Sequence, residues 1–151
     1  MNKSNEFERF SDVIRDSKEH HDICEWQNFK LDLSVAFEHR KSIAEHIQDS
    51  IPNYKTINGL YSFFDWDKCL YLGKGRPIWK RIKCHYDAAQ GHDKARRWCD
   101  FFSQYRHCVT VYWLEFDPLS DDRDNDQLRS VLEYLLQRKY QPLFDNTGYI
   151  G

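Results

Sequence analysis

The spacing of apolar residues changes along the chain, and each change marks a different predicted element. Between residues 34 and 49 apolar side chains recur every three or four positions, as Phe37, Ile43, Ala44 and Ile47 do. This spacing predicts an amphipathic helix, and residues 5–19 are also interpreted as helical. Pro52 ends the second helix, because proline disfavours helical backbone in the residue before it. Residues 1–55 are therefore predicted to form a helical N-terminal extension.

From residue 57 onward the pattern becomes typical of β-strands. Residues 57–64 and 69–72 are short apolar and aromatic runs, and the polar stretch 65–67 between them favours a turn. Two such runs joined by a short turn predict a β-hairpin. The aromatic and β-branched run 108–116 predicts a third, buried strand.

Helices are predicted on either side of that third strand. Pro77 suits the first turn of a helix that runs to about residue 89, and a second helix covers about 92–104. Asp124 or Asn125 can cap a last helix, which ends near Lys139. Residues 56–151 therefore follow the order ββααβα, which indicates a single small α+β domain.

Composition limits the class of protein. A chain of 151 residues allows one domain of ordinary size, and it contains no apolar run long enough to span a membrane. The charged first ten residues argue against a secretory signal. Five cysteines form neither an even set nor a CxxC pair, so we expect a cytoplasmic protein without a disulfide scaffold.

The charge is divided unevenly along the chain. The net charge of −2 alone argues against a nucleic-acid-binding protein. However, residues 68–106 carry a net +7, while residues 1–50 and 107–151 each carry −4. Such a basic segment attracts phosphate groups. The alternative is a solvated face whose charges pair with the acidic flanks.

Several residues with chemical potential follow one another on the predicted elements. Tyr61 and Tyr71 lie on the two strands of the hairpin, where they can approach each other. Arg81 and His85 are four residues apart and share one face of the next helix. Glu133 lies on the last helix, away from its apolar stripe, and Asn146 follows that helix.

At these positions the chain resembles the GIY-YIG nuclease superfamily over about residues 57–147. Gly59-Leu60-Tyr61 and Tyr71-Leu72-Gly73 are similar to the two signatures, each with Leu in place of Ile. Arg81, Glu133 and Asn146 follow in the family's order. The resemblance implies a three-stranded antiparallel sheet flanked by helices, and a nuclease domain that occupies residues 56–151.

The resemblance also implies a one-metal hydrolysis of DNA. Glu133 would bind Mg²⁺, with Mn²⁺ as a possible substitute, since Mg²⁺ takes few protein ligands and keeps several waters. Arg81 would stabilise negative charge on the phosphate in the transition state. Tyr61 would contact or deprotonate the attacking water, and Tyr71 would hold the phosphate or orient that water. His85 would relay a proton or bind phosphate.

Other residues complete the predicted site. A neutral tyrosine is a poor base at pH 7, so a neighbouring cation is needed, and Lys74 is the candidate. Substrate contacts are assigned to residues of the basic segment and the late Asn, namely Arg76, Lys80, Lys83, Arg96, Arg97 and Asn146. Trp79 and Trp98, on the basic helices, could stack on bases.

Three alternatives stay open at this point. The chain could be a non-catalytic module on the same fold that binds nucleic acid or protein. It could also keep the chemistry but act on RNA or branched DNA. The acidic N-terminal extension could pack on the domain, cover its basic face or form a homodimer.

Overall fold

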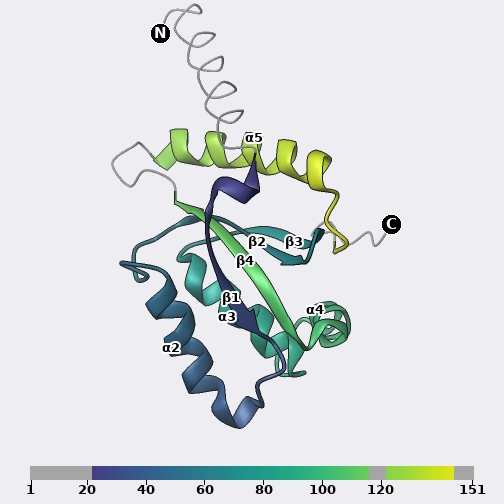
Figure 1. The fold of residues 1–151 in the computed structure, drawn as a ribbon. Helices are drawn as coiled ribbons and strands as arrows, with labels where there is room; N and C mark the ends of the chain where they lie inside the picture. Colours follow the sequence, from purple (N-terminus) through teal and green to yellow (C-terminus); the bar gives the residue numbers. More distant parts are fainter. Residues whose placement is uncertain (1–21, 116–121, 145–151) are drawn as a thin grey trace, which may run out of the picture.

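Four strands form one antiparallel sheet with helices on both of its faces (Figure 1). The computed structural model describes residues 22–115 and 122–144, with backbone only for 122–129. The order across the sheet is β1-β4-β2-β3. The strands are β1 (Gln27–Asp32), β2 (Gly59–Asp65), β3 (Lys68–Gly75) and β4 (Cys108–Glu115).

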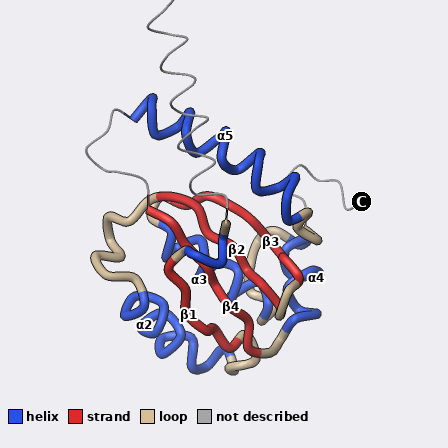
Figure 2. The backbone as a smooth tube through the Cα atoms, turned by 45° about the horizontal axis from the view of Figure 1, so that its top comes forward, coloured by secondary structure: helices blue, strands red, loops and turns tan. Residues whose placement is uncertain are grey.

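The helices divide into two layers, as Figure 2 shows. Helices α2, α3 and α4 cover one face of the sheet, and α5 covers part of the other. Their bounds are α2 (Arg40–Ser50), α3 (Ile78–Ala89), α4 (Arg96–Phe102) and α5 (Asp122–Tyr140). Short 3₁₀ turns occur at Ile23–Glu25, Phe37–His39 and Ser103–Tyr105. In the described part of the chain no helix is both long and apolar enough to cross a membrane.

Strand β1 corrects the predicted sheet. It pairs antiparallel with β4, with Gln27 opposite Trp113 and Asp32 opposite Cys108. Phe29 and Leu31 point into the core while Lys30 between them is exposed, so this segment has the two-residue period of a strand. The sheet therefore has four strands rather than three, and residues 1–55 are not helical throughout. The predicted helix at 34–49 is present as α2, whereas 5–19 lies outside the described residues.

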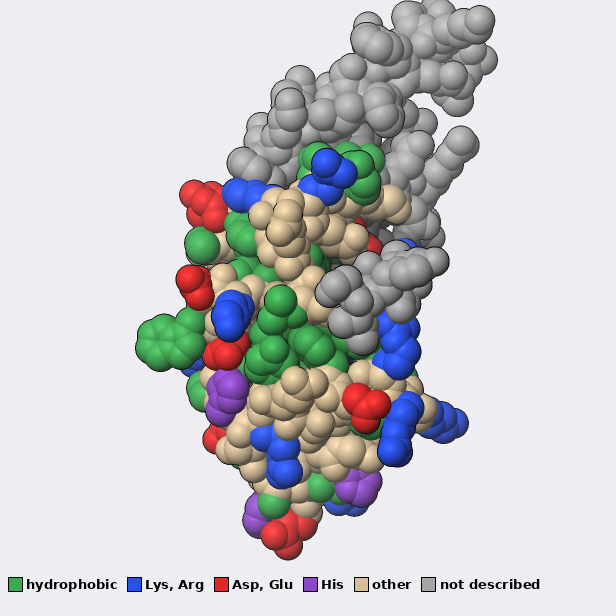
Figure 3. Space-filling model, turned by 90° about the vertical axis from the view of Figure 1, so that its right-hand side faces the viewer, with side chains coloured by type: hydrophobic (Ala, Val, Ile, Leu, Met, Phe, Trp, Pro, Cys, Tyr) green, Lys and Arg blue, Asp and Glu red, His purple; other side chains and the backbone are tan. Residues whose placement is uncertain are grey.

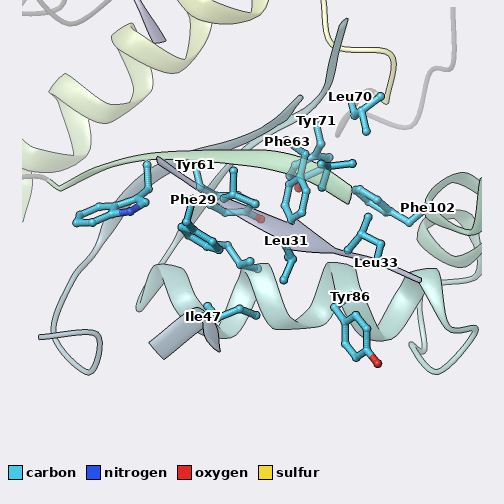
Figure 4. Close-up of a cluster of buried hydrophobic side chains, with 14 of the residues drawn as sticks. Phe29, Leu31, Leu33, Ile47, Tyr61, Phe63, Leu70, Tyr71, Tyr86 and Phe102 are labelled. Carbon is cyan, nitrogen blue, oxygen red and sulfur yellow. The ribbon is translucent and has the colours of Figure 1, made fainter. Parts of the chain in front are cut away.

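The larger core lies between the sheet and α2, α3 and α4 (Figure 4). The side chains that point into this core occur at every second residue on the strands. On the helices they occur about one turn apart, as Ile43 and Ile47 do on α2. Phe63, Phe102 and Ile82 are fully buried there. Removing each such side chain from water contributes about 1.5–3 kcal/mol to folding.

Helix α5 closes the opposite face of the sheet. Leu132 and Leu136 are fully buried against Leu60 and Leu72. At the end of the helix, the Tyr140 hydroxyl accepts a hydrogen bond from the Ile23 backbone N–H at 3.0 Å. The apolar stripe predicted for the last helix is thus the surface that α5 packs on the sheet.

A β-bulge in β3 shapes the region that carries the tyrosines. Phe63 pairs with Tyr71 and Phe64 with Cys69, so Leu70 has no partner in β2. Leu70 and Tyr71 consequently belong to the same core. On the outer edge of β3, the Leu143 and Phe144 backbone N–H groups donate to the carbonyls of Cys69 and Leu70 at 3.0 and 2.9 Å. The chain after α5 is thereby fastened along β3.

Candidate functional site

Tyr61 and Tyr71 meet above a glycine. Their rings lie 5.8 Å apart at 25° to each other, and both side chains are buried. Gly73 pairs with Tyr61 across the two strands. A Cβ at Gly73 would lie 2.5 Å from Cε1 of Tyr71 and 3.0 Å from each hydroxyl oxygen. The two hydroxyl groups can therefore converge only because residue 73 has no side chain.

His85 reaches this pair from α3. Its Nε2 lies 2.6 Å from the Tyr61 hydroxyl oxygen, and its side chain is fully buried. The rings of Trp98 and Phe102 enclose the imidazole at 4.3 and 4.7 Å between centroids. Burial, with a smaller effect of the nearby Arg81 charge, holds the pKa of His85 well below 6.5. His85 is therefore neutral at pH 7, and its Nε2 can accept the Tyr61 proton.

Arg81 lies one helical turn before His85 and reaches the same hydroxyl. Its guanidinium lies beside the Tyr61 hydroxyl and 4.8 Å from the ring centroid of Trp98. Arg81 as a whole is exposed. Burial, together with Tyr71, raises the pKa of Tyr61 well above 10, and Arg81 opposes this shift. Tyr61 is consequently neutral at pH 7, with Arg81 and His85 on its hydroxyl.

Lys74 does not face the tyrosines. It pairs with Leu60, whose side chain is buried in the α5 layer, and paired residues share a face of the sheet. Tyr61, Tyr71 and Gly73 belong to the opposite face. The cation beside Tyr61 is therefore Arg81, and the geometry does not support Lys74 in that role.

The other basic residues differ in what their side chains contact. Arg97 on α4 places its guanidinium 5.2 Å from the ring centroid of Phe144, whose ring is 5.7 Å from that of Tyr71. Lys83 forms an ion pair with Asp87 at 3.0 Å. Arg96 Nε lies 3.8 Å from Asp100 Oδ1. Arg76, in the loop before α3, and Lys80, on α3, are exposed. Figure 3 shows Lys and Arg side chains along one border of a face whose middle is hydrophobic.

Glu133 comes from the other layer. It is half-buried on α5, beside the core residue Leu132, and its Oε1 accepts a hydrogen bond from Gln137 Nε2 at 3.5 Å. The described side chains contain no cluster of three or more His, Cys, Asp or Glu that could bind a metal. A single carboxylate still suits Mg²⁺, which keeps most of its waters. Asn146 lies outside the described residues.

The sequence did not reveal the aromatic platforms of this site. Trp98 was considered for stacking on bases, and in the structure its ring packs against His85 and Arg81. Phe144 similarly joins Tyr71 to Arg97. The useful signal is the placement of aromatic residues next to arginines on adjoining elements, because guanidinium groups favour aromatic faces.

No known protein family, curated protein or solved structure matches this chain. A function must therefore be inferred from the site. Its defining group is Tyr61, Tyr71, Arg81 and His85, which the fold brings together from two strands and one helix.

The buried His85 predicts that stability falls in acid. The unfolded chain binds a proton at His85 near pH 6.5, whereas the folded chain does not because burial depresses the folded pKa. Stability from this residue is thus complete above pH 6.5 and decreases below it, by up to about 1.4 kcal/mol per pH unit. Urea unfolding between pH 7 and 5 should show a steeper loss for the wild type than for His85→Leu. The exposed His39→Gln is the control, and equal slopes for all three would contradict the prediction.

Proposed function

We propose that the protein is a metal-dependent endonuclease that hydrolyses phosphodiester bonds of DNA, in the manner of the GIY-YIG nucleases that it resembles. The observation that carries the proposal is the hydrogen bond between Tyr61 and His85, with Arg81 beside the same hydroxyl and Tyr71 stacked on Tyr61. These residue types, in this chain order, are the ones that the resemblance assigns to catalysis.

The two arginines are suited to bind the reacting phosphate. Arg81 and Arg97 lie over Trp98 and Phe144, and both rings lie within 6 Å of the Tyr71 ring, at 5.9 and 5.7 Å between centroids. Both arginines are exposed. Guanidinium groups held on aromatic faces keep their N–H donors available for phosphate oxygens. Arg81 would stabilise the charge that develops on phosphorus.

The burial of Tyr61 defines its part in the reaction. Tyr61 is fully buried beside the Arg81 guanidinium, and its hydroxyl can donate its proton to neutral His85. The Tyr61–His85 pair would thereby help to position the guanidinium before substrate arrives. Tyr61 and His85 thus act as positioning residues here, while the resemblance assigns Tyr61 a direct contact with the attacking water.

Glu133 is the residue that would hold Mg²⁺. When bound, the cation would polarise the phosphoryl oxygen and lower the pKa of a coordinated water. Gln137 donates to the Glu133 carboxylate and helps to fix its orientation. The other steps would be carried out by side chains of the protein. The arginines would bind the phosphate, and the tyrosines and His85 would hold Arg81 in place.

Metal dependence is the direct test of this function. The wild-type protein should be incubated with labelled linear, branched and single-stranded DNA and with RNA, in Mg²⁺, in Mn²⁺ and in EDTA. Cleavage of at least one DNA is expected with either cation, and none is expected in EDTA. Exclusive cleavage of RNA would change the substrate class. Binding without cleavage would favour a non-catalytic nucleic-acid-binding module, a reading consistent with the full burial of Tyr61 and His85.

A further inference from the structure

A hollow lies at the C-terminal end of α5, outside the tyrosine group. It has a volume of about 270 Å³ and is lined by Tyr134, Gln137, Arg138, Gln141, Pro142 and Phe144. Tyr134 is 59% exposed, and the Arg138 guanidinium lies 5.7 Å from its ring centroid. The Arg138 guanidinium also donates to the Tyr134 hydroxyl at 3.4 Å, so the hollow is bordered by two neighbouring flat groups, a phenol and a guanidinium.

The lining has the chemistry that recognises a nucleobase. Aromatic rings and guanidinium planes stack on bases irrespective of their identity. Carboxamides supply a donor and an acceptor side by side, the pattern that pairs with base edges. Gln137 and Gln141 provide two such groups. The described lining residues include no carboxylate, and the nearby Glu133 carboxylate accepts from Gln137 Nε2 at 3.5 Å.

Gln141 has an unusual backbone. Its φ is +47°, and its N–H donates to the Gln137 carbonyl at 2.9 Å, which closes the end of α5. Glycine is the residue that takes this conformation without strain. A glutamine that bears this strain is a candidate for a role of its side chain, since strain is tolerated where function depends on it.

The hollow borders the proposed catalytic residues on two sides. Gln137 donates to Glu133, and Phe144 packs against Tyr71 below the Arg97 guanidinium. We infer that this hollow binds one unpaired nucleobase next to the phosphate held by Arg81 and Arg97. The inference rests on the proposed nuclease function and adds a substrate preference to it: DNA with an extrahelical or single-stranded nucleotide at the cleavage site.

Binding in EDTA tests the hollow without requiring cleavage. Fluorescence anisotropy should compare a labelled DNA duplex that contains one unpaired adenine with the fully paired duplex of the same sequence. The wild type is expected to bind the first about tenfold more tightly. Tyr134→Leu should remove this preference, and Tyr134→Phe, which keeps the ring, should retain it.

Two further variants separate recognition from folding. Gln141→Gly relieves the backbone strain, so its melting temperature should equal or exceed that of the wild type while the preference is lost. Trp66→Leu removes another exposed aromatic residue, 95% exposed and outside the hollow, and should keep the preference. Equal affinity of the wild type for both duplexes, binding to neither, or a preference that survives Tyr134→Leu and Gln141→Gly overturns the inference. If the wild type prefers the unpaired adenine but cuts no DNA in Mg²⁺, the inference about the hollow stands and the proposed nuclease function is wrong.

Discussion

Replacing Glu133 with glutamine is expected to abolish Mg²⁺-dependent cleavage while the affinity for DNA stays close to that of the wild type. Glutamine keeps the shape and the contact with Gln137 but removes the negative charge that would hold the cation. Loss of the metal's stabilisation of the transition state amounts to several kcal/mol, or a rate decrease of about 10³-fold or more. Single-turnover cleavage in Mg²⁺ and anisotropy in EDTA measure the two properties separately.

Glu45→Gln is a suitable comparison, because it makes the same change of charge at an exposed position on α2. It should cut at the wild-type rate. If Glu133→Gln cuts as fast as Glu45→Gln, Glu133 is not the metal ligand, and another carboxylate must be sought.

Replacing Arg81 with alanine is expected to lower the turnover rate by about 10²- to 10³-fold, the usual effect of losing one donor to transition-state charge. The effect should appear in kcat more than in KM, because Arg97 and the other basic residues still bind the substrate. Removing the guanidinium also takes a neighbouring positive charge from the Tyr61 hydroxyl, which keeps its hydrogen bond with His85. Steady-state kinetics on the best substrate of the panel would give both constants.

Arg40→Ala is a suitable control, because it also removes a guanidinium group that packs on an aromatic ring. The Arg40 guanidinium lies 4.7 Å from the ring centroid of Phe37, much as Arg81 lies 4.8 Å from that of Trp98. Arg40 is exposed on α2 and has no part in the proposed site. A similar kcat for the two variants would remove Arg81 from the catalytic group.

The hairpin, helix α3 and strand β4 were predictable from short apolar runs around a turn, from Pro77 at a helix start and from an apolar, aromatic run. The second helix was predicted over about 92–104, and α4 is shorter, Arg96–Phe102. Strand β1 was not predicted, although Phe29 and Leu31 alternate with polar residues. The alternation covers only two inward positions, and the partner strand β4 begins at Cys108, far along the chain. A segment this short is defined by the strand that it joins more than by its own pattern.

The sequence predicted that Tyr61 and Tyr71 approach each other, but not that Tyr61, Tyr71 and His85 are buried. Four-residue spacing correctly placed Arg81 and His85 on one face of α3. Full burial of His85 depends on Trp98 and Phe102 of α4, and no local pattern contains that packing. The position of Lys74, by contrast, could have been predicted correctly. Side chains alternate along a strand, so Lys74 lies on the opposite face of β3 from Tyr71 and Gly73.

The pairing of residues 143–144 with β3 has a consequence for the order of events during synthesis. Tyr71 packs against Phe144, and the carbonyls of Cys69 and Leu70 accept hydrogen bonds from the Leu143 and Phe144 backbone. The hairpin can form early on the ribosome, because its contacts are local. The surroundings of Tyr71 are complete only after residue 144 has left the exit tunnel. A nascent chain therefore carries the two tyrosines long before it carries a finished site, so the activity proposed here would begin only after residue 144 has been released.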